Sequence, residues 1–408
     1  MNSSSRTVTQ SKSRIYVLKP LKPITADTTA ITTPSPNTSV DSLIAAKLPV
    51  RKIQSLHPTQ RPVPTPGKCV IKLGLDVDLQ KITVATQYDH SAIKPVAAFS
   101  VAELLPWIRQ RLAEGHVVWT VYEACGFGYT LHHQLTTAGA HNLLIGPVRL
   151  DPQRRRKNDG LDARALCTRL SRYLDGQKTE LPLIRVPTLA EQQRRETGRQ
   201  RDFWKGQLQS VDNHARALRL EHEHQTLPRH WWGPRNWKKV APQVGDFVRS
   251  FLEAFREQIL LCKKQLDALT AELEARVAQE KLPRGLGDLT MALFDAELCN
   301  PFRFGNRKEI GSYVGCCPSE HSSGAAQHFG HIDRHGNKHL RVLMVEAVWR
   351  LIRFQSQWHA LKKVVTRLQA GTALRKKTVI ALARQLAIDL WRIRTERATW
   401  VGLGLFPK

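Results

Sequence analysis

The chain has 408 residues, of which 41% are hydrophobic, so it can bury a large core and form two or three domains. Its 62 Lys and Arg against 35 Asp and Glu give a formal net charge of +27, which repels itself unless a polyanion neutralises it. Nucleic acid is therefore the first partner to consider. The seven cysteines are scattered without a CxxC pair, which argues against a disulfide framework or a zinc ribbon. Without a long apolar run or a secretory leader, we expect no membrane partner and a cytoplasmic location.

Residues 1–67 are rich in Ser, Thr, Pro and Lys, and we predict a disordered basic tail there. Residues 68–186 then follow the pattern of a mixed α/β domain. Predicted strands cover 69–79, 81–88, 95–99, 116–123 and 142–148, and predicted helices cover 101–114, 129–138 and 161–173. A three-strand meander followed by strand, helix and strand is the order of a ribonuclease H-like domain.

The remaining chain is predicted to be mostly helical, so the fold class is α/β plus α. Residues 187–280 read as a long helical coiled-coil arm, broken near 228–242, whose apolar stripes pair within a chain or between chains. Residues 281–408 form a third region, in which a loop rich in Gly, His and Ser at 315–339 precedes further helices.

Four carboxylates stand out in the predicted α/β domain. Asp76 lies inside an apolar strand, where an unpaired charge is costly to bury, and Glu123 ends another apolar strand. Asp159 and Asp162 stand three residues apart at a helix start, where their negative charge is tolerated. Together they predict a site for Mg²⁺ or Mn²⁺, since hard cations prefer oxygen ligands. The simpler alternatives are that Asp159 or Asp162 caps the helix and that Glu123 faces solvent.

These residues resemble a known family, the DEDD-type insertion-sequence transposases of the IS110 and IS1111 group. Its three acidic motifs are similar to Gly74–Val77, Tyr122–Gly126 and Asn158–Arg164. Its C-terminal transposase domain is similar to Pro283–Gly287, Tyr313–Gly315, Pro318–Gly324 and His335–Arg341. The resemblance implies a RuvC-like first domain and a transposase that cuts and rejoins DNA. Arg284, inserted between Pro283 and Gly285, departs from the common Pro-Gly turn and leaves its conformation open.

The segment Pro318–Gly324 offers three hydroxyls, of Ser319, Ser322 and Ser323, beside a glycine. Residue chemistry alone does not choose among them, and serine-rich loops are mostly turn formers. The resemblance implies that Ser323, directly before the glycine, is the catalytic nucleophile and forms a covalent phosphoserine with DNA.

The resemblance also implies partners. Members of the family work on donor and target DNA, guided by an element-encoded bridge RNA, and assemble as a dimer of dimers. For this chain it thus implies a bacterial, nucleoid-associated homo-oligomer.

Several basic groups are candidates for nucleic-acid binding. Arg154, Arg155, Arg156 and Lys157 directly precede the third acidic motif, and Arg334, Lys338 and Arg341 follow the serine segment. The tryptophans at 231, 232 and 237 lie among cations, and they either stack on unpaired bases or anchor the arm in a partner subunit. The histidines at 331, 335 and 339 suggest zinc only weakly, because Gly336 indicates a turn between them.

Two rival functions remain at the level of sequence. A structure-selective RuvC-like endonuclease would use the same carboxylates with water as nucleophile. A non-catalytic nucleic-acid-binding protein would need only the positive charge.

Overall fold

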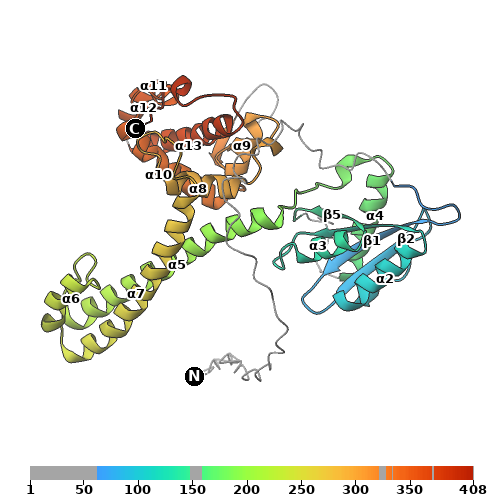
Figure 1. Ribbon diagram of the computed structural model, residues 1–408, viewed down its shortest axis with the longest axis horizontal. Helices are drawn as coiled ribbons and strands as arrows, with labels where there is room; N and C mark the ends of the chain where they lie inside the picture. The colour runs from blue at the N-terminus through green and yellow to red at the C-terminus, as the bar shows by residue number, and fades with distance from the viewer. Residues whose placement is uncertain (1–61, 148–158, 321–327, 333, 370–371, 408) are drawn as a thin grey trace, which may run out of the picture. The chain divides into compact units, whose positions relative to one another are not determined.

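The computed structural model describes residues 62–147, 159–320, 328–332, 334–369 and 372–407. Most of the predicted tail, the basic group at 154–157 and Ser323 lie outside these residues. The described part combines one five-stranded sheet with many helices, so the predicted mixed α/β class is confirmed (Figure 1).

The sheet contains β1 (Val70–Val77), β2 (Ile82–Tyr88), β3 (Ala97–Phe99), β4 (Val117–Glu123) and β5 (His141–Ile145), in the order β3-β2-β1-β4-β5. The first three strands run antiparallel, as the predicted meander requires, because short turns join them. β4 runs parallel to β1 and β5 runs parallel to β4, each reached through a helix.

Side chains of alternate residues divide the sheet into two buried faces. Leu73, Leu75 and Tyr122 pack on one face with α2 (Val101–Ala113) and α3 (Thr130–Thr137). Trp119 and Val121 pack on the other face with α4 (Asp159–Leu174). The near-continuous apolar sequence of β4 follows from burial on both faces.

The arm consists of α5 (Leu189–Glu223), α6 (Pro234–Val240) and α7 (Asp246–Ala275), with a short 3₁₀ turn at Ala241–Gln243 (Figure 1). Leu208, Val211 and Ala215 of α5 share one apolar cluster with Leu252 and Ile259 of α7. Apolar residues of the two long helices of the arm therefore pack against each other within one chain.

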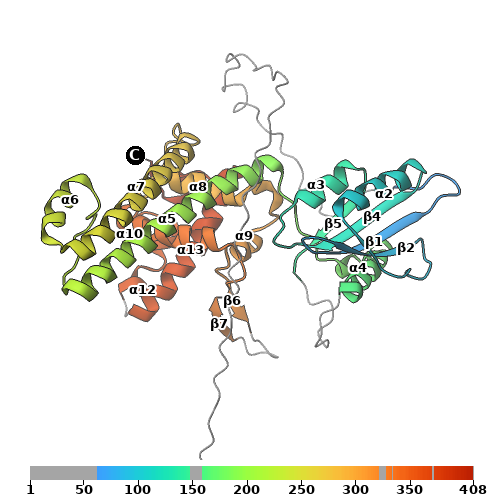
Figure 2. The same cartoon turned by 90° about the horizontal axis from the view of Figure 1, so that it is seen from below.

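The C-terminal region packs its helices around a large apolar core. Its elements are α8 (Asp288–Leu298), α9 (Arg307–Val314), β6 (Pro318–Glu320), β7 (Phe329–Ile332), α10 (Lys338–Phe354), α11 (His359–Lys362), α12 (Val365–Gln369) and α13 (Thr372–Arg394). Short 3₁₀ turns lie at Lys178–Glu180, Pro301–Arg303 and Val401–Leu403. The strands β6 and β7 pair as an antiparallel hairpin within the segment expected to be only a loop (Figure 2).

None of the described helices combines the length and the apolar character needed to cross a membrane.

Candidate active site

Asp76 and Glu123 lie at the same end of neighbouring parallel strands. Leu75 pairs with Tyr122 in the register of β1 and β4, and each carboxylate residue follows that pair by one position. Since side chains alternate along a strand, both carboxylates belong to the face opposite Leu75 and Tyr122. That face is the one covered by α4. Both residues are half-buried.

The helix α4 runs over this face in the direction opposite to β1. Near its C-terminal end, Lys72 Nζ donates a 2.8 Å hydrogen bond to Ser171 Oγ. Further along β1, Gly74 lies against the backbone of Ala163 and Cys167. Because the two elements run in opposite directions, the end of β1 that carries Asp76 lies toward the first turn of α4, which carries Asp159 and Asp162.

An ion pair places the start of α4 at the same end of the sheet. Lys81 Nζ lies 3.5 Å from Asp159 Oδ2, and Lys81 directly precedes β2, whose first residue pairs with Val77. Asp159 and Asp162 are half-buried, and the first turn of a helix favours negative charge.

The structure places all four carboxylate residues at one end of one face, but it does not bring them into a closed cluster. Among the described residues, no three His, Cys, Asp or Glu side chains form a group that could hold a metal ion. The described histidines at 331, 335 and 339 likewise belong to no such group.

The thiol of Cys167 lies beside this face and has no counterpart in the predicted chemistry. It donates a 3.5 Å hydrogen bond to the Lys72 carbonyl oxygen. Burial raises the pKa of the Cys167 thiol to about 11, so it remains protonated at neutral pH and serves packing.

The first three residues of the serine segment, Pro318–Glu320, form β6 and pair with β7. Ser319 Oγ donates a 3.1 Å hydrogen bond to the carbonyl oxygen of His331 across the hairpin. This contact gives Ser319 a structural role, whereas Ser322 and Ser323 lie outside the described residues.

Two glycines join the base of this hairpin to the neighbouring helices. A Cβ on Gly336 would collide with the backbone of Ser312, Tyr313 and Gly315, so two chain segments meet there without side chains between them. Gly315 ends α9 with a φ of 69°, which favours glycine. The Asn337 amide donates a 2.6 Å bond to the Tyr313 carbonyl oxygen and fixes this crossing.

Glu297 is a buried residue that the sequence reasoning missed. Its carboxylate accepts hydrogen bonds from Arg199 Nε at 3.2 Å and from Asn337 Nδ2 at 2.7 Å. Asn337 also caps α10 through its side-chain oxygen, and Tyr313 Oη donates to the Glu297 carbonyl oxygen at 2.9 Å. Glu297 thereby connects the long helix α5 to the start of α10 and the base of the hairpin.

The predicted nucleic-acid-binding cations after the serine segment differ in their surroundings. Arg334 and Lys338 are exposed. Arg341 is half-buried, and its guanidinium donates to the carbonyl oxygens of Val314 at 3.2 Å and Arg334 at 3.3 Å. These contacts hold the end of α9 and the chain before α10 together, which is a structural role.

Trp231 fits neither alternative proposed for the tryptophans of the arm. It is fully buried in the apolar cluster of its own arm, and its Nε1 donates a 2.8 Å hydrogen bond to Asp212. Trp232 and Trp237 are half-buried beside it.

Residues 282–363 match the sequence model of the Transposase IS116/IS110/IS902 family. A putative transposase of Sinorhizobium fredii, y4rJ, is 27% identical over 71% of this chain and 80% of its own length. The transposase of insertion sequence element IS1111A of Coxiella burnetii is 23% identical over 69% and 78% of the two chains. The transposase of IS1328 of Yersinia enterocolitica is 23% identical over 80% and 97%.

The mixed α/β sheet with its carboxylates and the helical C-terminal region thus occur in a chain that is similar to proteins named as transposases. The predicted resemblance to the IS110 family of insertion-sequence transposases is confirmed, and a transposase function is supported.

Proposed function

We propose that the chain cuts and rejoins DNA as a transposase, with Asp76, Glu123, Asp159 and Asp162 as one part of its active site and Ser323 as the other. The observation that carries this proposal is the gathering of two strand-end carboxylates and the acidic first turn of α4 at one end of one sheet face. The strand order β3-β2-β1-β4-β5, with three antiparallel strands followed by two parallel ones, supports the part of the proposal that makes this domain ribonuclease H-like and RuvC-like.

The four carboxylates fit a hard divalent cation by their donor chemistry, because Mg²⁺ and Mn²⁺ prefer oxygen ligands. When bound, such an ion supplies charge stabilisation to the phosphate under attack and to the departing oxygen. The described side chains do not form a closed group in this structure, so they would have to move closer together when the metal ion binds. Asp159 would then leave Lys81 for the ion.

The serine performs the covalent step in this proposal. Ser323 Oγ attacks the phosphorus of a DNA phosphodiester, an O–P bond forms, and the bond to one of the DNA oxygens breaks. The proton of the hydroxyl ends on the departing DNA oxygen. The phosphoserine conserves the energy of the phosphodiester, so a second DNA hydroxyl can attack it and rejoin strands without ATP. The base of the hairpin, held by Asn337, Gly336 and Glu297, would set where this segment stands.

The partners of this reaction are donor and target DNA, and we propose that a bridge RNA selects them and that four subunits assemble around them. The net charge of +27 supports binding of a polyanion. The RNA and the four-subunit assembly come into the proposal from the family resemblance seen in the sequence motifs alone.

The first test of the carboxylates compares Asp76→Asn with Asp78→Asn in DNA cleavage with Mg²⁺. Asp78 lies just beyond β1 and is exposed, so its substitution removes the same charge outside the proposed site. We expect Asp76→Asn to lower cleavage at least about 100-fold while DNA binding persists, and Asp78→Asn to remain near wild type. Cleavage by Asp76→Asn at the wild-type rate would overturn the assignment.

Denaturing gels of the protein incubated with DNA test the serine. Incubation with nicked DNA should yield a protein–DNA adduct that Ser323→Ala loses and Ser322→Ala retains, with mass spectrometry locating the linked residue. Cleavage without an adduct under trapping conditions would favour the endonuclease that uses water. Binding without any cleavage would favour the non-catalytic alternative.

A further inference from the structure

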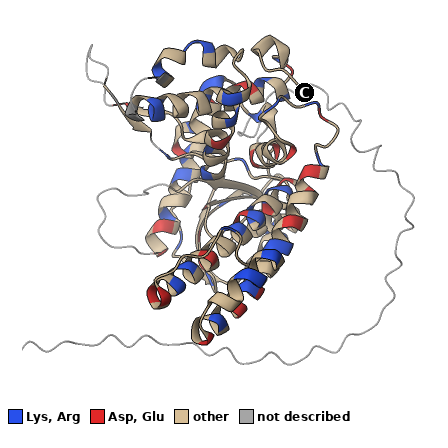
Figure 3. Cartoon of the chain, turned by 90° about the vertical axis from the view of Figure 1, so that its left-hand side faces the viewer, with Lys and Arg blue, Asp and Glu red and all other residues tan. Residues whose placement is uncertain are grey.

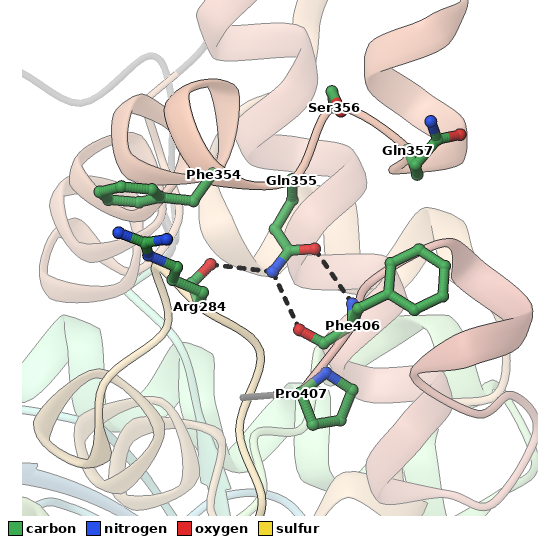
Figure 4. A pocket seen from close by; sticks show the side chains of 7 residues that line it. All are labelled: Arg284, Phe354, Gln355, Ser356, Gln357, Phe406 and Pro407. Atoms are coloured by element: carbon green, nitrogen blue, oxygen red, sulfur yellow. Dashed lines mark hydrogen bonds between the residues drawn. The ribbon is translucent and has the colours of Figure 1, made fainter.

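A hollow of about 370 Å³ lies where α10 ends, next to the last residues of the chain (Figure 4). This volume is in the range of pockets for small organic ligands. Its lining includes Arg284, Phe354, Gln355, Ser356, Gln357 and Phe406. Among the described residues that line the hollow there are one guanidinium and two phenyl rings, and no carboxylate side chain.

The buried side chain of Gln355 fixes the floor of the hollow. Its Nε2 donates hydrogen bonds to the carbonyl oxygens of Arg284 at 3.1 Å and Phe406 at 3.0 Å. Its Oε1 accepts a 3.0 Å bond from the Phe406 amide. Three segments distant in sequence are thereby held together, so the hollow is formed before any ligand arrives.

Arg284 is presented to the hollow by a tight turn. The Leu286 amide donates to the Pro283 carbonyl oxygen at 2.9 Å, and Gly285 has a φ of 102°, which favours glycine. A Cβ on Gly285 would lie 3.3 Å from the backbone of Arg350, so the turn packs directly on α10. The conformation left open by the inserted arginine is thus one that turns Arg284 outward, where it is exposed.

The guanidinium of Arg284 lies over the ring of Phe354, 4.5 Å from the ring centre (Figure 4). Arg353 lies 5.4 Å from the same ring. Phe354 and Phe406 remain 37% and 47% exposed, so both phenyl rings are accessible to a ligand. Within the described part of the chain, no carboxylate forms an ion pair with Arg284.

A planar cation stacked on an exposed aromatic ring suits a ligand that is itself flat and attached to negative charge. Bases of unpaired nucleotides stack on aromatic rings and on arginine planes, and their phosphates are attracted to nearby cations. A simple anion would not need the two phenyl rings, and an apolar ligand would not need the two guanidinium groups.

We propose that this hollow binds one unpaired nucleotide of RNA or DNA, whose base stacks on the outer face of the Arg284 guanidinium, which the ring of Phe354 supports from behind, and whose backbone passes Arg353. Phe406 supplies a second apolar wall on the other side of Gln355 (Figure 4). The inference rests on the proposed function only in requiring a nucleic-acid partner. The carboxylates and Ser323 take no part in it.

The test uses the full-length protein in EDTA with short single-stranded oligonucleotides containing 2-aminopurine, whose fluorescence falls when the base stacks. RNA and DNA oligonucleotides are separate arms, and a duplex serves as a reference with no unpaired base. Arg284→Lys keeps the charge but removes the planar stacking surface. Arg367→Lys, at an exposed arginine of α12, is the matched control.

We expect Arg284→Lys to lower single-strand affinity about tenfold, or about 1.4 kcal/mol, and to weaken the fluorescence change, since the variant loses the planar surface on which the base stacks. Phe354→Leu should act in the same way, while Arg367→Lys should match wild type. Equal affinity and fluorescence for Arg284→Lys and wild type in both arms would overturn the proposal.

Because binding is measured without metal, Asp76→Asn should bind the oligonucleotides like wild type. Loss of DNA cleavage therefore does not affect this binding test. The nucleotide-binding proposal and the proposed active site can each be wrong without the other. A response in only one arm identifies whether RNA or DNA supplies the nucleotide. Arg284 is exposed, so Arg284→Lys should retain the thermal unfolding midpoint of wild type.

Discussion

At the scale of single residues, close packing on Gly74 sets the distance between α4 and the sheet. The nitrogen and Cα of Cys167 and the carbonyl oxygen of Ala163 occupy the place where a Cβ would stand. The helix α4, whose first turn carries Asp159 and Asp162, can therefore pack this closely on β1 only because position 74 has no side chain.

We predict that Gly74→Ala pushes α4 away from β1 and lowers the free energy of unfolding by about 1–3 kcal/mol, as overpacking does in other cores. DNA cleavage should fall as well, because the acidic first turn of α4 moves with the helix. Urea unfolding and the cleavage assay measure the two effects.

Gly206→Ala provides the control, since a Cβ at this position of α5 meets nothing within 4 Å. Alanine favours a helix, so this variant should be as stable as wild type or more stable. Wild-type stability and cleavage in Gly74→Ala would contradict the packing argument.

The sequence identifies candidate site residues only where a charged residue interrupts an apolar stretch. Asp76 and Glu123 stand out because they interrupt apolar strands. Glu297 lies at the end of an equally apolar helix, but its partner Arg199 is 98 residues away in the sequence. The same reasoning applied to α8 would have identified Glu297 as unusual, although its partner becomes visible only in the fold.

At the scale of elements, strong periodicity made the prediction accurate. The predicted strand 116–123 is β4, Val117–Glu123, and the predicted helix 101–114 is α2, Val101–Ala113. The hairpin β6–β7 was missed because strands of three and four residues are too short to show alternation, and glycine and serine around them favour a loop. Whether the apolar stripes of the arm meet within one chain was also left open by the sequence, because either arrangement buries them.

The start of α5 is capped by a carboxylate, that of Glu191, whose protonation would weaken the cap. Glu191 is buried and accepts two 2.8 Å hydrogen bonds from Arg185 and one from the Thr188 amide, which completes the capping box. Burial alone would raise the pKa of Glu191, but the bonds from Arg185 and Thr188 outweigh it and hold the pKa below its usual value.

We predict that this cap stabilises α5 at neutral pH and is lost in acid. A lowered pKa in the folded state means that the stabilisation is complete above the usual glutamate pKa and disappears as the pH falls through the folded value. Glu191→Gln should therefore speed amide hydrogen exchange in the first turn of α5 at neutral pH, by about 1–3 kcal/mol of local opening free energy.

The difference between wild type and Glu191→Gln should shrink as the pH is lowered. Glu196→Gln, on the exposed side of the same helix, is the control and should change local opening by less than about 0.5 kcal/mol throughout. A difference that stays constant into acid would show that the carboxylate charge does not hold the cap.

At the scale of the whole molecule, the excess of positive charge is spread over many helices and is partly used inside the protein. Lys and Arg alternate with Asp and Glu along the helices of the arm and the C-terminal region (Figure 3). Arg199 pairs with Glu297, and Arg394 pairs with Asp295 and Glu280. A count of charges therefore predicts a polyanionic partner, although it cannot tell which cations face that partner.

The last prediction concerns the RNA proposed to guide the enzyme. Without it, DNA should be bound mainly through counterion release, which gives weak and unselective binding with a steep dependence on salt. Restoring the RNA should make binding selective and allow recombination of a matching donor and target.

The experiment compares RNase-treated protein with and without the co-purified RNA added back. It measures DNA binding at increasing KCl and recombination of defined DNAs. Lys338→Ala, at an exposed cation, should reduce the slope of log affinity against log salt by about 1 without changing which DNA is chosen. If RNase-treated protein still recombined one defined DNA sequence, the protein itself would read that sequence and the guide would be unnecessary.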